Sequence, residues 1–221
     1  KNVDGIIFTN SYTSTNQSLV ELIRKLNVPV IMLDRGLDDE SLSGVYVDNE
    51  KAGYLATKHL IELGHTKIGC ITGPQHIQNS KDRLNGYLKA LSESELPIEQ
   101  SRIISGDYQM EGGYLAAKQL LGEQNITAVF ALNDLMAFGV YQAAVELGIH
   151  IPGDLSVVGF DNLRYNQILN PKLTTIEQPV YKMGETAFHL LMKQLKEGKE
   201  AQREVLYLDA ELIIRESTTR L

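Results

Sequence analysis

The sequence is poor in residues that cross-link a chain or anchor it in a membrane. Its single cysteine, Cys70, lies within the apolar run KIGCITG, so an internal disulfide is excluded and we expect a buried strand thiol. No apolar run reaches the roughly 20 residues of a membrane-spanning helix. The sequence begins without an initiator methionine or a signal-peptide pattern, and we expect the interior of a longer, cytoplasmic protein.

Positive charge is also scarce. Lysine and arginine number 21 against 28 aspartate and glutamate residues, which gives a formal net charge of −7. Surfaces that bind nucleic acid carry an excess of basic side chains that neutralise phosphates. If the protein binds DNA, a segment outside this sequence must make the contact.

The motifs of common catalytic sites are missing. No glycine-rich phosphate loop follows a strand, G-x-S-x-G is absent, and the five histidines lack metal-ligand spacing. A glycosidase pair of carboxylates would require a separation that sequence does not define. We therefore expect no metal, no cofactor and no enzyme.

Short runs rich in β-branched residues alternate with longer amphipathic segments along the whole chain. The strand-like runs include VDGIIFT, VPVIMLD, KIGCITG, ITAVFALN and LSVVGFD. Helix-like segments such as NEKAGYLATKHLIELG and DLMAFGVYQAAVELG separate them. This alternation predicts an α/β fold with parallel sheets covered on both faces. Ligands of such folds bind outside the carboxyl ends of the strands.

Polar and aromatic side chains follow these expected strands. They are Asp34 and Arg35, Arg83 after a loop, Asp107 and Tyr108, Asn133 and Asp134, Phe160 and Asp161, and Gln178. Acids and amides accept hydrogen bonds, arginine donates from a rigid fork, and aromatic rings cover C–H faces. The set suits a neutral sugar better than an anion, because its acids would repel a phosphate.

Several of these residues also admit a purely structural role. Asn133 or Asp134 can cap the following helix, and Asp48 or Asn49 can cap an earlier one, which we favour over ligand contact there. The turn at 106–108 can be only a turn. A surface salt bridge is an equal alternative for Arg83.

Ordered motifs along the chain resemble the effector-binding core of the LacI/GalR family of bacterial repressors. They include VDGIIF, VPVIMLDR, VDNEKAGYLATKHLIELGHTKIGCITG, DRLNGYLKAL, AVFALNDLMAFGVYQAAVELGIHIPGDLSVVGFDN, PKLTTIEQP and ELIIREST. The resemblance implies a type I periplasmic-binding-protein-like fold, with two doubly wound parallel-sheet lobes, three crossing strands and a ligand cleft between the lobes. Residues 1–47 with 179–204 would form the N-terminal lobe, whose first strand, helix and strand are absent. Residues 49–177 with 205–217 would form the C-terminal lobe.

The same resemblance implies a function. It assigns ligand contacts to Asp34, Arg35, Arg83, Tyr108, Asn133, Phe160, Asp161 and Gln178. The set is similar to that of ribose-binding members of the superfamily, so D-ribose is the first expected effector and related monosaccharides come next. The implied protein is a homodimeric repressor that binds operator DNA through a missing helix-turn-helix. A sugar-binding protein of a transport system is the alternative.

Overall fold

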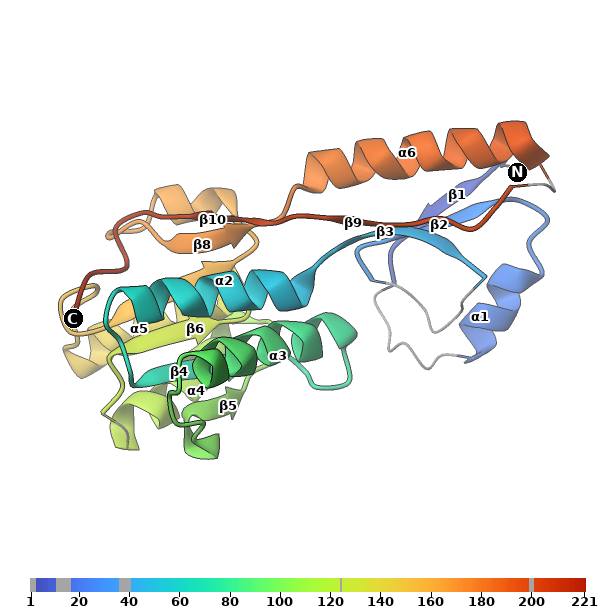
Figure 1. Ribbon diagram of the computed structural model, residues 1–221. Coiled ribbons are helices and arrows are strands. Elements are labelled where there is room, and N and C mark those ends of the chain that lie inside the picture. Colours follow the sequence, from blue (N-terminus) through green and yellow to red (C-terminus); the bar gives the residue numbers. More distant parts are fainter. Residues whose placement is uncertain (1–2, 11–16, 36–40, 124, 199–200) are drawn as a thin grey trace. The chain divides into compact units, whose positions relative to one another are not determined.

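The computed structural model describes residues 3–10, 17–35, 41–123, 125–198 and 201–221, which form two α/β units. The first unit comprises Lys1–Asp48 and Pro179–Asp209, and the second comprises Asn49–Gln178 and Ala210–Leu221. The chain therefore passes from one unit to the other three times (Figure 1). Both units are built on parallel sheets, which confirms the predicted fold class.

The third passage lies later in the chain than the sequence suggested. Residues 205–209 belong to the first unit, because strand β9 (Val205–Leu208) pairs with β3 (Ser43–Val47) over its whole length. The run EVLYLDAELIIRES contains no glycine or proline that would mark the change of sheet. Strand pairing decides the boundary there, and local sequence does not reveal it.

The first unit contains a four-stranded parallel sheet in the order β1-β2-β3-β9. Its remaining strands are β1 (Ile6–Phe8) and β2 (Val30–Leu33), and its helices are α1 (Gln17–Arg24) and α6 (Val180–Glu197). Helix α6 packs on β1, β2 and β3, and turns Met183, Ala187, Leu190 and Leu191 inward. Its apolar spacing of three and four residues is that of a helix with one buried face.

The second unit contains a six-stranded sheet in the order β10-β8-β7-β6-β4-β5. Only β10 (Glu211–Ile213) runs antiparallel, beside β8 (Thr174–Glu177). The parallel strands before β8 are β4 (Ile68–Thr72), β5 (Ile103–Ser105), β6 (Ala128–Ala131) and β7 (Ser156–Phe160). Every residue of β4, β6 and β7 is buried, as expected where helices cover both faces.

Two pairs of helices cover this second sheet. Helix α2 (Asn49–Glu62) packs against α3 (Gln78–Glu93), and α4 (Met110–Glu123) packs against α5 (Asp134–Leu147). Short 3₁₀ turns lie at Gln100–Arg102 (η1) and Arg164–Gln167 (η2). Strands β5 and β6 lie on opposite sides of β4, so the winding direction reverses there. Crevices at such reversals are the usual ligand sites of open α/β sheets.

The amino edge of the second sheet is tied to the end of the chain through His65. This histidine is buried, with Nδ1 3.0 Å from Thr127 Oγ1 and Nε2 3.0 Å from both Ser156 Oγ and the Thr219 carbonyl oxygen. Burial lowers the pKa of His65 from its ordinary value of 6.5. The neutral ring is therefore the form that this packing stabilises.

Candidate functional site

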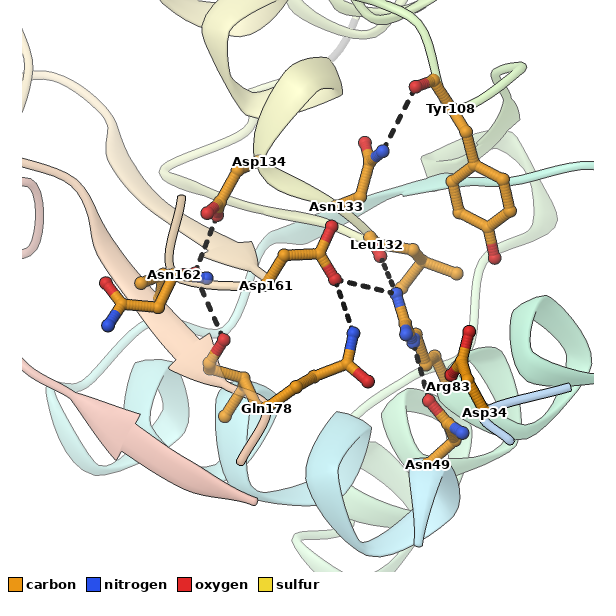
Figure 2. A network of polar contacts seen from close by, with 12 residues as sticks. Asp34, Asn49, Arg83, Tyr108, Leu132, Asn133, Asp134, Asp161, Asn162 and Gln178 are labelled. Atoms are coloured by element: carbon orange, nitrogen blue, oxygen red, sulfur yellow. Dashed lines mark hydrogen bonds and ion pairs between the residues drawn. The ribbon is translucent and has the colours of Figure 1, made fainter. Parts of the chain in front are cut away.

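Arg83 forms the centre of a polar network at the carboxyl edge of the second sheet (Figure 2). Its side chain projects from α3 and the residue is only 4% exposed. Nε donates to Asn49 Oδ1 at 2.8 Å, and Nη1 donates to the Leu132 carbonyl oxygen at 2.7 Å. The guanidinium carbon lies 3.5 Å from the centroid of the Phe160 ring. Arg83 is thus held in one orientation, and the surface salt bridge considered as its alternative is wrong.

Two members of this network act as supports. Phe160 was expected to contact the ligand, but its ring is completely buried and its described contact is with Arg83. Asn49 was expected to cap a helix, yet its buried side chain accepts from Arg83. The position of Asn49 just after strand β3 was the signal that could have identified it.

The acid and the amide that follow β7 and β8 bind each other directly. Gln178 Nε2 donates to Asp161 Oδ1 at 2.7 Å, and the same oxygen lies 3.8 Å from Arg83 Nη1. The strands β7 and β8 are neighbours, which brings their carboxyl ends together. The side chain of Asp161 is 26% exposed against 5% for Arg83, so its carboxylate is the more accessible partner for a ligand.

Asn133 has the capping role that the sequence offered as one alternative. Its Oδ1 accepts from the Met136 amide at 2.9 Å at the start of α5, and its Nδ2 donates to the Tyr108 carbonyl oxygen at 3.0 Å. This amide therefore joins the end of β6 to the turn after β5. Tyr108 is fixed further by Gly73, where an added Cβ would lie 2.2 Å from the tyrosine ring.

Backbone strain gathers at the same strand ends. The non-glycine residues with positive φ among those described are Asp34 (63°), Glu95 (54°), Tyr108 (67°), Asp161 (113°) and Asn162 (53°). All except Glu95 follow β2, β5 or β7. Conformations of this kind cost about 1–3 kcal/mol each and concentrate at functional sites. Three of these residues, Asp34, Tyr108 and Asp161, are also predicted ligand contacts.

The first unit carries its own strand-end pair. Asp34 and Arg35 follow β2, and Arg35 Nε lies 3.7 Å from Asp34 Oδ2. The Asp34 amide donates to the Val45 carbonyl oxygen at 3.0 Å, which fixes the turn beside β3. Thus six of the expected ligand residues gather at one edge of the second unit, while Asp34 and Arg35 lie at the carboxyl edge of the other sheet.

Other sites for small ligands are less convincing. In the part of the chain that the structure describes, no group of three acidic, histidine or cysteine side chains could hold a metal ion. A surface hollow of about 380 Å³ is lined by Lys193, Glu197, Gln202 and Glu204. Lys193 already pairs there with both glutamates, so its ammonium group is engaged within the protein. Over the same described ranges, no helix combines the length and apolar character needed to cross a bilayer.

Comparison with known proteins identifies the family. Residues 57–218 match the family described as periplasmic binding protein-like domain. The chain is 35% identical over 223 residues to the repressor PurR of Photobacterium profundum and 37% identical over 222 residues to the regulator DegA of Bacillus subtilis. Each alignment covers 100% of this chain and 66% of the relative, so the chain spans about two thirds of those proteins.

Solved structures agree with these relatives. A LacI family transcriptional regulator from Enterococcus faecium with bound ribose matches with a TM-score of 0.90 and 34% identity, over 99% of this chain and 81% of that one. Another from Enterococcus faecalis, also with bound ribose, matches with a TM-score of 0.89 and 32% identity, over 100% and 79%. These relatives are regulators, neither enzymes nor transport proteins. The chain therefore belongs to the LacI family of transcriptional regulators and carries its periplasmic-binding-protein-like domain.

Proposed function

We propose that the chain is the effector-sensing part of a cytoplasmic repressor and that its effector is a free monosaccharide, with D-ribose first. The observation that carries this proposal is the Arg83, Asp161 and Gln178 network. It offers a partly exposed carboxylate and an amide, held beside a buried guanidinium. Vicinal hydroxyl groups, which donate and accept at adjacent carbons, match that arrangement.

The surrounding charge favours a neutral sugar over its phosphate. Asp161 is the accessible acid of the network, whereas Arg83 already donates to Asn49 and Leu132. A phosphate group would approach a carboxylate without a free cationic fork to neutralise it. Ribose bound to two similar regulators supports the choice of sugar, whereas the similarity to PurR makes a purine the rival effector.

We also propose ligand roles for Asp34 and Arg35 and a homodimer that binds operator DNA through a segment outside this sequence. Binding of the sugar would stabilise one conformation of the protein and so shift a population. Operator binding would then change sugar affinity by the same factor, because coupling is reciprocal. Equal operator affinity with and without every sugar tried, measured on the full-length protein, would refute this coupling.

The effector is tested by calorimetry and thermal unfolding with ribose, ribose 5-phosphate, other pentoses, hexoses and purines. Ligand that binds only the folded state raises the melting temperature as its concentration exceeds the dissociation constant. We expect ribose to bind and its phosphate to bind at least tenfold more weakly. A response to purines alone would keep the fold and overturn the sugar.

The role of Asp161 is tested with Asp161→Asn, because asparagine tolerates positive φ better than alanine does. Loss of a hydrogen bond to a charged group costs about 1.5–3 kcal/mol, so ribose affinity should fall at least tenfold. Asp154→Asn is the matched control, since Asp154 accepts from the His150 amide in an exposed turn before β7. Equal ribose affinity of Asp161→Asn and the parent would contradict the assignment.

A further inference from the structure

The carboxyl group of Asp134 is buried directly behind the candidate site. Asp134 is the first residue of α5 and is completely buried. Its Oδ2 accepts from the Leu163 amide at 2.8 Å and from Asn166 Nδ2 at 2.7 Å, and its Oδ1 accepts from Thr175 Oγ1 at 2.6 Å. Three donors from the chain after β7 and from β8 therefore converge on one acid.

These donors hold the turn that carries Asp161. Asp161 and Asn162 both have positive φ, and Leu163, the next residue, is anchored to Asp134. Thr175 provides a second link between Asp134 and this turn. Its hydroxyl oxygen accepts from the Asn162 amide at 3.4 Å. A strained turn persists only where its surroundings fix it at several points.

Two neighbours show that the pocket is built for a carboxylate. An added Cβ at Gly159 would lie 2.3 Å from Asp134 Oδ1, so glycine leaves the space that the oxygen occupies. Asn166 is fully buried and directs its Nδ2 to Asp134, while its Oδ1 has no hydrogen-bond partner among the described residues. The acceptor on Asp134 thus determines how Asn166 is oriented.

We propose that Asp134 is a positioning residue, whose ionised carboxylate holds residues 161–163 in the conformation that presents Asp161 to the sugar. Asp134 itself does not touch the ligand. This inference rests on the proposed sugar site and gives a specific role to Asp134, which was predicted as a polar strand-end residue and, alternatively, as a helix cap.

The charge state of Asp134 gives the proposal a pH signature. Burial raises the pKa of Asp134 to about 7, Asp161 adds to the rise, and the hydrogen bonds from Thr175, Leu163 and Asn166 oppose it. The other ionisable groups nearby are Tyr141 on the same helix, and Arg215 and Glu177, which bind the Asn162 side chain. Protonation removes an acceptor from the turn, so ribose affinity should decline as pH falls through about 7.

The test measures ribose binding by calorimetry between pH 6 and 8 for the full chain and its variants. Asp134→Asn should bind ribose at least tenfold more weakly at pH 8 and should lose the step near pH 7. Thr175→Val keeps the side-chain shape but removes the bond that lowers the pKa, so its step should move to higher pH. Asp154→Asn, in the exposed turn before β7, should match the parent throughout.

A second readout separates this inference from the proposed sugar site. Amide exchange of Leu163, measured without ligand, should accelerate in Asp134→Asn relative to amides elsewhere in the second unit. Ribose binding by the parent with an unchanged affinity and pH profile in both variants would overturn the positioning role. Absence of ribose binding by the parent would overturn the sugar site. The positioning role would then be decided by Leu163 exchange alone, and unaltered exchange in Asp134→Asn would overturn it.

Discussion

Replacement of Arg83 by methionine should destabilise the second unit even without ligand. The change leaves Asn49 Oδ1 and the Leu132 carbonyl oxygen as buried acceptors without their donor. Each such group costs about 1–3 kcal/mol, and the cation–π contact with Phe160 contributes about 0.5–2 kcal/mol more. Methionine packs on the ring and avoids the desolvation of a guanidinium, so we expect a net loss of about 3–5 kcal/mol.

Thermal and urea unfolding measure this loss. For a unit of roughly 150 residues, about 4 kcal/mol corresponds to a fall in melting temperature of about 10 °C. Lys81→Met, on the exposed part of the same helix, is the matched control and should change stability by less than about 0.5 kcal/mol. The double variant Arg83→Met with Asn49→Leu should lose less than the sum of the single variants, because it removes both partners. A melting temperature of Arg83→Met within about 2 °C of the parent would show that the buried network does not stabilise the fold.

Three further outcomes follow from the second unit. Folding lowers the pKa of His65, so its contribution to stability is complete above pH 6.5 and is lost as pH falls through the lower pKa of the folded state. Melting curves from pH 7.5 to 5 should show this decline, and His65→Gln should flatten it. Gly73→Ala should displace the Tyr108 ring and weaken ribose binding in calorimetry, with little effect expected from Gly122→Ala, where nothing lies within 4 Å. Burial raises the pKa of the Cys70 thiol, so iodoacetamide should label it only after unfolding; rapid labelling of the native protein, detected by mass spectrometry, would contradict its burial in β4.

Sequence periodicity was sufficient for the fold class because the strands of the second unit are buried on both faces. A strand such as β7 reads SVVGF, with no polar alternation, and that pattern is typical of covered parallel sheets when helix-like segments separate the strands. The passage from β9 to β10 was not predictable in the same way. Both strands are similar in composition, and the change of sheet depends on partners that lie far away in the sequence.

The sequence predicted which strand ends carry the site residues, but not which of those residues support the others. Arg83, Asp161 and Gln178 were predicted from the sequence, and the structure joins them. The contact of Arg83 with Phe160 and its hydrogen bond to Asn49 were not predictable, since they depend on how α3 packs beside β7 and α2. Asp134 was among the predicted strand-end residues, but its positioning role was not predictable, because an acid at the start of a helix has an adequate local explanation as a cap.

The bonds of Asn49 and Gln178 place the candidate site where the backbone enters and leaves the second unit. Asn49 is the first residue of that unit and binds Arg83, while Gln178 is the last residue before the chain departs toward α6 and binds Asp161. Under the proposed function, a ligand that competes for Arg83 or Asp161 would loosen the hydrogen bond that holds Asn49 or Gln178. Substitutions around this pair would then change the effector and leave these two backbone attachments in place.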